Sequence, residues 1–410
     1  MSVDSPVYPF SLQLNALCDD AAAYGPEQAS VIDADGVRSA MASIGSWPGY
    51  KPSPLVRLDG VAAAAGVGAV FYKDESERFG LGSFKALGGA YAVARLLVAQ
   101  VIAKTGDAGV TIDDILAGRY GDRVAGLTVC CATDGNHGRS VAWGAQMFHC
   151  KCVIFIHRTV SEGRKIAIEK FGAQVIRTAG NYDDSVRQAQ QEASRNGWFV
   201  VSDTSYEGYM DVPRDVMAGY TVMAQETIDQ LPQDMPATHL FLQTGVGGMA
   251  AAVVARFWQV FAAERPRAVL VDPDQAACWV ASFRAGRPTA IDGDLDTIMA
   301  GLACGEVSLL AWKILAPAAR AAIAVSDLAA ADCMALLADG RLGDGPLVAG
   351  ESAVAGLAGL LAAAADPDGR EKLGLTDRSC VVLFGTEGDT DPDVYQRIVG
   401  ASAATVRARQ

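Results

Sequence analysis

Short apolar runs and longer amphipathic stretches alternate along the middle of the chain. Four of the apolar runs have the length of buried strands; they lie at 124–132, 152–156, 174–177 and 199–201. Helix-like stretches separate them, notably 138–148 and 161–171. This alternation predicts an α/β fold in which helices cover both faces of a parallel sheet.

A second alternating set of strands and helices runs from 240 to 383. Before the first set, a helix-like run at 37–44 should end at the proline-rich loop 46–54, and the glycine-containing stretch 99–123 resembles a connection or insertion. A chain of 410 residues, 50% hydrophobic and with 43 glycines, is long enough for two domains and a large core. We therefore expect two open α/β domains.

The formal net charge is −13, which argues against nucleic acid or an anionic membrane as a partner. The first ten residues lack the basic residues and the continuous apolar core of a signal peptide. The longest alanine-rich runs, such as 353–365, are shorter than a membrane span of about 18 to 20 residues. We expect a cytoplasmic protein with no membrane or nucleic-acid partner.

The nine cysteines do not suggest a disulfide framework, because cytosolic thiols stay reduced. One cluster deserves comparison with a metal site: Cys150 and Cys152 would share a strand face, and His157 follows. However, no second Cys-x-x-Cys completes a tetrahedral site, and 153–156 has the pattern of a buried strand. We expect buried, inert thiols and no metal.

Lys85 stands where a charged stretch gives way to an apolar, helix-like run that ends near Val98. Small and apolar neighbours disfavour the charged ammonium, so the neutral amine becomes available for Schiff-base chemistry. The alternative is an ordinary helix lysine that extends its ammonium to water. Lys85 is therefore a candidate anchor for pyridoxal phosphate, provided that the chain also offers a phosphate site.

Two loops supply what such a cofactor needs. Residues 243–250 contain three glycines, follow the strand-like run 239–242 and open an apolar helix-like run. Glycines there let successive backbone N–H groups converge on a phosphate at a helix N-terminus, where the helix dipole also favours negative charge. The polar loop 133–138 follows the strand-like run 124–132 and can lie against a bound ring, since open α/β sheets bind ligands at the carboxyl ends of their strands.

The glycine loop alone also fits a dinucleotide fingerprint, Gly-x-Gly-x-x-Ala at 245–250, with Asp272 where a ribose ligand is expected. That interpretation would make the chain a nicotinamide-dependent dehydrogenase, but it explains neither Lys85 nor the loop 133–138. A strand-to-helix turn without any ligand is a further alternative.

Taken together, these residues resemble the fold type II pyridoxal phosphate enzymes, and within them the ammonia-lyases that act on 2,3-diaminopropionate. The most discriminating stretches are Ser-Phe-Lys-Ala-Leu-Gly-Gly at 83–89, the aspartate before Gly-Asn-His-Gly at 135–138, and the run 296–306. Further matches follow in the family's order, so the resemblance covers the chain from about residue 46 to its C-terminus; they lie at 72–75, 78–81, 203–205, 243–250, 350–352 and 386–392.

The resemblance implies two open parallel-sheet α/β domains with the cofactor in the cleft between them. Residues 1–89 and 212–410 would form the large cofactor-binding domain, and 90–211 the small α/β domain. It also implies a homodimer whose partner molecule is a small amino-acid substrate.

Roles for individual residues follow from the same resemblance. Lys85 would hold the cofactor as a Schiff base and later move the Cα proton, and the glycine loop would hold the phosphate. Asn136 would bind the ring hydroxyl and Thr386 the pyridine nitrogen, although Thr386 alone fits equally a turn hydroxyl that caps its own backbone. The implied cofactor-binding residues are Lys85, Phe84, Asn136, Gly245, Val246, Gly247, Gly248 and Thr386.

Asp134 and Asp203 are the implied acid–base residues besides Lys85. A 2,3-diamino acid carries an extra ammonium, which carboxylates would bind, and the departing ammonia requires a proton. From the sequence alone a helix N-cap or an Asx turn is the better interpretation of each aspartate, and the matching family positions reverse that order. The resemblance makes Asp134 the base for the D isomer. We expect His137 to fill the packing of the small domain, and 387–391 to be a solvated acidic loop near the cofactor edge, with a substrate-facing role as the alternative.

The implied activity is that of a lyase. It would remove ammonia from 2,3-diaminopropionate by α,β-elimination and give pyruvate and two ammonia molecules through aminoacrylate. Two positions depart from the family pattern and leave the substrate open: Tyr206, where tryptophan is usual, and Thr244, where alanine is usual. The alternatives are a dehydratase or lyase for another β-substituted alanine, such as serine, threonine or a hydroxyaspartate, and a non-catalytic relative that keeps the cofactor as a scaffold.

Overall fold

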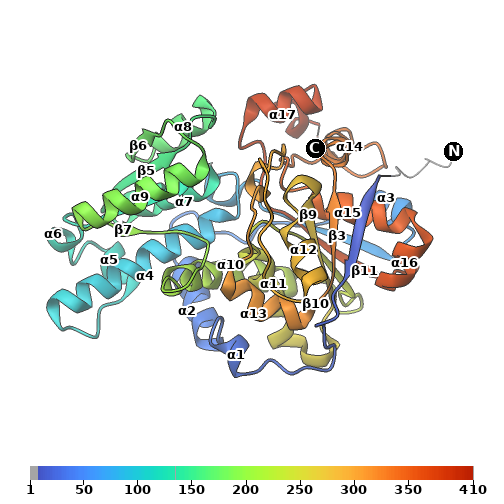
Figure 1. Ribbon diagram of the computed structural model, residues 1–410, viewed down its shortest axis with the longest axis horizontal. Coiled ribbons are helices and arrows are strands. Elements are labelled where there is room, and N and C mark those ends of the chain that lie inside the picture. The colour runs from blue at the N-terminus through green and yellow to red at the C-terminus, as the bar shows by residue number, and fades with distance from the viewer. Residues whose placement is uncertain (1–7, 134, 410) are drawn as a thin grey trace. The chain divides into compact units, whose positions relative to one another are not determined.

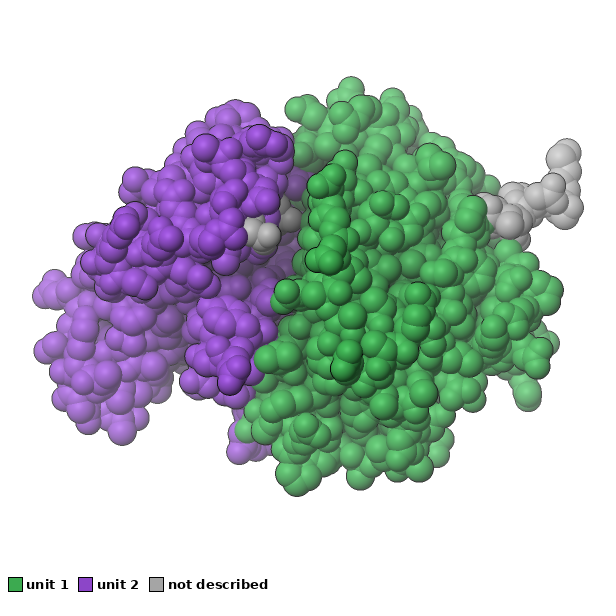
Figure 2. Space-filling view, in the orientation of Figure 1, with its two compact units in different colours: residues 1–33, 52–78, 223–410 green, residues 34–51, 79–222 purple. Residues whose placement is uncertain are grey.

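The computed structural model describes residues 8–133 and 135–409. They form two compact units, which Figure 2 distinguishes by colour. Unit 1 takes the described residues of Met1–Asp33, Pro52–Arg78 and Met223–Gln410, and unit 2 takes those of Ala34–Lys51 and Phe79–Val222.

This division differs in extent from the domain boundaries expected from the sequence. Residues 34–51 and 79–89, which the sequence analysis placed in the large domain, make their contacts within unit 2, and unit 2 continues to residue 222. The helix that begins at Lys85 explains part of the difference, because it packs along its length on other helices of unit 2. The boundaries 1–89, 90–211 and 212–410 stay a prediction about functional domains.

Unit 1 contains a seven-stranded sheet (Figure 1). Its five central strands run parallel, whereas the two edge strands run antiparallel to their neighbours, so the sheet is mixed rather than wholly parallel. Its strands are, in order across the sheet, β1 (Phe10–Leu14), β10 (Ala319–Val325), β9 (Arg267–Pro273), β8 (His239–Gln243), β11 (Cys380–Gly385), β3 (Ala69–Asp74) and β2 (Leu55–Arg57).

The central strands of this sheet are buried on both faces. Phe241, Val269 and Val271 point to one face, where they pack with α3 (Asp59–Ala65), α14 (Asp327–Asp339) and α15 (Ala355–Ala365). Asp272 follows Val271 and so points to the opposite face, where it contacts α12 (Cys278–Ala285). Burial on both faces explains why these strands read as continuous apolar runs rather than alternating ones.

Unit 2 contains a four-stranded parallel sheet. On one face Cys130, Val153 and Phe155 pack with α9, and on the other α7 approaches so closely that a Cβ on Gly138 would lie 2.3 Å from Cγ2 of Thr133. The predicted helix–sheet–helix arrangement is therefore confirmed for this unit. Its elements are β6 (Gln174–Arg177), β5 (Lys151–Ile156), β4 (Thr128–Thr133), β7 (Phe199–Val200), α7 (Asn136–Met147) and α9 (Tyr182–Asn196).

The predicted connection at 99–123 is mostly helical. The helix that starts at Lys85, α4 (Lys85–Thr105), reaches into it, and α5 (Ile112–Leu116) and α6 (Gly121–Val124) follow. The other helices are α1 (Pro26–Ala29), α2 (Ala34–Gly45), α8 (Glu162–Glu169), α10 (Asp211–Gln230), α11 (Gly248–Phe261), α13 (Leu309–Ala318), α16 (Pro367–Leu373), α17 (Pro392–Val399) and α18 (Ala403–Arg407), with 3-10 turns η1 (Arg78–Gly80), η2 (Ala262–Glu264), η3 (Asp274–Ala276) and η4 (Ala300–Leu302).

Helix α4 is long and apolar enough to cross a membrane by length and composition alone, with a mean hydropathy of 1.6 over its most apolar 18 residues. However, 67% of that stretch is buried within the structure, as in the core helix of a globular protein. Its apolar character is accounted for by packing on α7, with which it makes the most extensive contact of any helix pair.

Candidate active site

Lys85 lies at the first position of α4, and the neighbours of its ammonium described below belong to unit 2. Its Nζ forms an ion pair with Oδ2 of Asp203. The same atom lies 5.4 Å from the ring centroid of Phe84 and 5.9 Å from that of Tyr220, within the range of cation–π attraction. The side chain keeps 20% of its surface exposed, so Lys85 is positioned by these contacts and is still accessible to a small molecule.

Close helix contacts fix the backbone at Lys85. The hydroxyl of Ser140 on α7 donates to the carbonyl oxygen of Lys85 at 2.6 Å and accepts from the N–H of Ala90 at 3.2 Å. A Cβ on Gly89 would lie 2.4 Å from Oγ of Ser140, and one on Gly88 would lie 2.4 Å from the ring of Tyr220. The two glycines after the lysine therefore let α4 approach its neighbours closely enough for these contacts.

Asp203 is the acidic partner of Lys85. Burial raises the pKa of its carboxyl group, but the positive charge of Lys85 and the nearby His137 lower it more, so the pKa lies well below its usual value. Nδ1 of His137 lies 3.8 Å from Oδ2 of Asp203, and Nε2 of the same ring donates to the carbonyl of Val201 at 2.8 Å. His137 is buried in the packing, as expected, and in addition faces this carboxylate.

The loop expected to lie beside the cofactor ring connects β4 to α7. The hydroxyl oxygen of Thr133 accepts from the N–H groups of Gly135 and Gly138 at 3.0 and 3.1 Å, so the end of β4 is bonded to the start of α7. Asn136 is the first residue of α7. Asp134 itself lies outside the described residues.

The glycine loop belongs to unit 1 and joins β8 to α11. Gly247 has a φ of +95°, and a Cβ there would lie 2.3 Å from the indole of Trp279, so only glycine fits. The carbonyl of Gly245 accepts from Nε1 of Trp279 at 3.0 Å, and that of Val246 accepts from the N–H of Ser308 at 2.9 Å.

These carbonyl contacts determine where the loop's N–H groups point. In a trans peptide the C=O and the following N–H point in opposite directions, so the N–H groups of Val246 and Gly247 point away from Trp279 and Ser308. Among the residues that the structure describes, none accepts from either N–H. Successive unpaired N–H groups at the start of α11 form an anion-binding site, and this donor set fits the phosphate of pyridoxal phosphate.

Thr386 follows β11 and is buried. Its hydroxyl oxygen accepts from Nε2 of Gln243 at 2.9 Å, and the same amide donates to the carbonyl of Phe384 at 2.6 Å. The contact recorded for the hydroxyl is thus with Gln243 on β8 and not with the backbone of its own turn. Because the oxygen accepts, the hydroxyl hydrogen stays available as a donor, which suits an unprotonated ring nitrogen.

The acidic run 387–391 was expected to be a solvated loop, and that prediction is wrong. Glu387 is 4% exposed. One of its carboxylate oxygens accepts from the N–H of Ser352 at 3.0 Å, and the other accepts from the hydroxyl of Thr390 at 3.1 Å. Asp391 caps α17. Glu387 and Asp391 therefore accept hydrogen bonds from groups of the protein.

Asp272 does not have the environment of a ribose ligand. It is fully buried, and burial raises its pKa to about 7. Oδ1 accepts from the hydroxyl of Thr244 at 2.5 Å, and Oδ2 accepts from the N–H groups of Trp279 and Val280 at 2.9 and 3.3 Å. Its oxygens are therefore occupied within unit 1, and the dinucleotide interpretation loses the residue on which it depended.

The structure does not assemble a metal centre at the cysteine cluster. Cys152 is buried, and burial raises the pKa of Cys150 to about 12, so the thiols stay protonated. Within 8–133 and 135–409, no group of three or more His, Cys, Asp or Glu side chains is placed to hold a metal ion.

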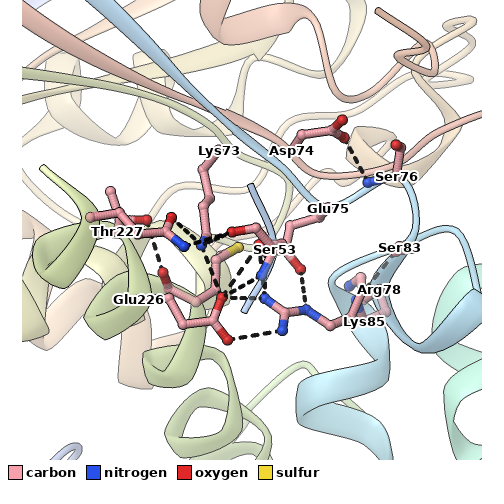
Figure 3. Close-up of polar contacts among 12 residues, drawn as sticks. Ser53, Lys73, Asp74, Glu75, Ser76, Arg78, Ser83, Lys85, Glu226 and Thr227 are labelled. Atoms are coloured by element: carbon pink, nitrogen blue, oxygen red, sulfur yellow. Dashed lines mark hydrogen bonds and ion pairs between the residues drawn. The ribbon is translucent and has the colours of Figure 1, made fainter. Parts of the chain in front are cut away.

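Unit 1 contains a buried charge network that was not predicted from the sequence (Figure 3). The guanidinium of Arg78 lies between the carboxylates of Glu75 and Glu226, with N–O distances of 2.8 and 2.6 Å. Nζ of Lys73 lies 2.9 Å from Glu226 and 2.7 Å from the carbonyl oxygen of Ser53. All four charged side chains are at most 3% exposed. Only the family match at 72–75 and 78–81 hinted at these residues.

The chain is similar to known proteins in both sequence and fold. A family profile described as pyridoxal-phosphate dependent enzyme matches residues 46–385. The diaminopropionate ammonia-lyase of Escherichia coli K12 is 40% identical over 355 residues, which are 86% of this chain and 88% of that protein.

Crystal structures of the Escherichia coli enzyme are also similar. Its complex with D-serine superposes with a TM-score of 0.85 at 34% identity, covering 96% of this chain and 97% of the other. Its complex with an aminoacrylate–pyridoxal phosphate azomethine reaction intermediate gives 0.83 at 35% identity, with the same coverage.

Proposed function

Because the chain belongs to the family of pyridoxal-phosphate dependent enzymes, we propose that it catalyses the α,β-elimination of ammonia from 2,3-diaminopropionate, with pyruvate and two ammonia molecules as products. The observation that carries the proposal is the pairing of Lys85 with the ionised Asp203, in a chain that matches ammonia-lyases over more than four-fifths of its length. The elimination needs a base at Cα and a group that recognises the second ammonium, and these two residues provide both.

The family resemblance assigns cofactor-binding roles to individual residues. Lys85 would bind its carbonyl carbon, the N–H groups of Val246 and Gly247 its phosphate, Asn136 its ring hydroxyl and Thr386 its ring nitrogen. When bound, pyridoxal phosphate supplies an electron sink that makes the Cα–H bond of an amino acid acidic.

Lys85 and Asp203 would act on the substrate's protons. The charge of Lys85 is what lowers the pKa of Asp203 against the effect of burial. When the amine of Lys85 is uncharged, that lowering is removed, and Asp203 can hold a proton more readily. Asp203 is thus anionic beside the charged amine of Lys85 and more basic beside the neutral amine. Such a carboxylate is suited to bind the second ammonium of the substrate and to exchange a proton with that ammonium.

Thr244, one of the two departures from the family pattern, does not change the substrate argument. Its hydroxyl is buried and donates to Asp272, so it is committed within unit 1. Tyr206, the other departure, is 42% exposed and stacks on Tyr209 with ring centroids 5.0 Å apart. The discrimination among β-substituted alanines is therefore assigned to the carboxylates and not to these two positions.

Parallel pyruvate assays test the proposal. The enzyme reconstituted with pyridoxal phosphate is given D- and L-diaminopropionate, serine and threonine, and we expect diaminopropionate to be turned over much faster than either hydroxy amino acid. Faster turnover of serine or threonine would mean a dehydratase. A visible cofactor band that borohydride abolishes, without release of pyruvate or another keto acid from any of them, would mean a non-catalytic relative.

We further propose that the protein is a cytoplasmic homodimer. The dimer is supported by the family resemblance, and the location by the acidic composition, which does not favour an anionic membrane. Light scattering of the purified holoenzyme should give twice the mass of the chain; a monomer mass would contradict the first part. Fractionation of the native cells tests the second.

A further inference from the structure

Asp272 connects two segments that border the glycine loop. Its Oδ1 accepts from the hydroxyl of Thr244, the residue just before the loop, while its Oδ2 accepts from the N–H groups of Trp279 and Val280 in the first turn of α12. One carboxylate thus joins the end of β8 to the start of α12. It does so without any exposed surface, in a site where burial disfavours its charge.

Trp279 carries this connection into the loop itself. Its indole N–H donates to the carbonyl of Gly245 at 3.0 Å. The ring lies where a side chain on Gly247 would have to be, and it is stacked on Trp312 with centroids 5.9 Å apart. The position of Trp279 therefore sets the orientation of the peptide after Gly245. It also leaves no room for a side chain at position 247.

Side chains therefore hold one face of the loop. On its other face, the N–H groups of Val246 and Gly247 have no acceptor among the described residues. Thr244 fixes where the loop leaves β8, and Trp279 turns the carbonyl of Gly245 toward itself, which turns the N–H of Val246 the other way. Preorganised donors bind an anion better than donors that must first be ordered, because the ordering cost is met during folding.

We propose that Asp272 is a positioning residue for the phosphate-binding loop, acting through Thr244 and Trp279. The inference rests on the cofactor of the family and not on the proposed substrate. It explains why a carboxylate is kept in a fully buried position where a neutral residue would be cheaper to bury. It also gives a role to the hydroxyl of Thr244, which stands where the family pattern usually has alanine.

The proposal predicts a loss that is specific to the phosphate group. Thr244→Val keeps the size and branching of the side chain but leaves Oδ1 of Asp272 without its donor. Trp279→Phe keeps an aromatic ring but removes the donor to Gly245. We expect each variant to bind pyridoxal phosphate roughly tenfold more weakly, the scale of one lost charge-assisted or well-placed hydrogen bond. Affinity for pyridoxal, which lacks the phosphate, should change by less than about twofold.

The experiment measures dissociation constants of the apoenzyme for pyridoxal phosphate and for pyridoxal from the visible absorbance of the bound form. Thr244→Ser restores the hydroxyl and should bring pyridoxal phosphate affinity back to within about twofold of the unaltered protein. Asp274→Asn is the matched control, because Asp274 is an exposed aspartate two residues further along, and it should change neither constant. Thermal unfolding of each apoenzyme shows whether a variant is folded.

Two results would overturn the proposal. An equal loss of affinity for both ligands would show that Thr244 and Trp279 support the fold in general and not the phosphate site. Unchanged pyridoxal phosphate affinity in Thr244→Val and Trp279→Phe would show that the loop needs no such support. Neither result bears on diaminopropionate turnover by the unaltered enzyme, so this test and that of the proposed function fail independently.

Discussion

Nζ of Lys85 and Oδ2 of Asp203 form an ion pair between residues that are 118 positions apart in the chain. The pair brings the start of α4 to the loop after β7, both in unit 2. A lysine in contact with an ionised carboxylate is ready to exchange a proton without further rearrangement. Consequences for catalysis and for stability follow from this one contact.

Replacing Asp203 by asparagine should separate cofactor binding from catalysis. The variant keeps the size of the side chain but loses the negative charge, so we expect pyruvate formation from diaminopropionate to fall by about 10²-fold or more, while the visible band of the bound cofactor is retained. Asp215→Asn is the matched control, since Asp215 pairs with Arg95 on a different part of unit 2 and should keep its activity. Full activity in Asp203→Asn would remove the residue from its proposed role.

The same pair predicts a pH dependence of stability. The pKa of Asp203 in the folded protein lies below its usual value of 3.8, so its ionisation contributes to the free energy of unfolding fully above about pH 5, and this contribution is lost progressively as the pH falls further. The difference in unfolding free energy between the unaltered apoenzyme and Asp203→Asn should therefore shrink between about pH 5 and about pH 3. Urea unfolding at a series of pH values measures it; a difference that grows on acidification would have the wrong sign.

Reductive labelling identifies the lysine that holds the cofactor. Borohydride treatment of the holoenzyme followed by peptide mapping should place the pyridoxyl group on Lys85, because its amine is partly exposed and lies at a helix N-terminus. Lys73 is the natural negative control, since it is fully buried and bound to Glu226. A label on Lys73 or on Lys313 would contradict the assignment.

Asp134→Asn should affect the two isomers of the substrate differently. A proton on the face of Cα opposite Lys85 needs its own base, and the family resemblance makes Asp134 that base for the D isomer. We expect the variant to lose activity on D-diaminopropionate far more than on the L isomer in side-by-side pyruvate assays. Equal losses would return Asp134 to a general role in binding.

Glu226→Gln should destabilise unit 1 through the buried network. Removing one carboxylate leaves Arg78 and Lys73 with only Glu75 to balance two buried positive charges, and breaking such a network costs about 3 to 5 kcal/mol of unfolding free energy. Denaturant unfolding measures the loss. Glu192→Gln, which breaks an ion pair with Arg195 on the surface of α9, is the control and should change stability by less than about 1 kcal/mol. A similarly small change for Glu226→Gln would mean that the network adjusts to the missing charge.

The sequence predicted the sheet of unit 2 best. The run 174–177 coincides with β6, and 152–156 differs from β5 by one residue, because turn residues and charged loops bound these short apolar runs on both sides. The run at 124–132 began too early: its first residue ends α6, and the strand starts at Thr128. An apolar residue at a helix end and one at a strand start look alike when only hydrophobicity is considered.

Other features depended on partners far away in the chain. The run 387–391 is acidic, but Ser352 and Thr390 provide the donors that let Glu387 be buried. Arg78 and Glu226 are 148 residues apart, and the sequence around either residue does not indicate that the two are in contact. The glycine loop was recognisable from its own residues, whereas Trp279, which shapes it, comes from a helix more than thirty positions later.

The strand order of unit 1 has a consequence for how the chain folds. β3 lies beside β11, and β1 beside β10, so segments from the beginning of the chain pair with segments from its end. Unit 2, by contrast, finds all partners of its sheet between residues 128 and 200. Such long-range pairing is slow, and domains emerge from the ribosome in order. During synthesis the smaller sheet can therefore assemble first. The strand β3 cannot pair with its parallel neighbour β11 until Cys380–Gly385 has been synthesised.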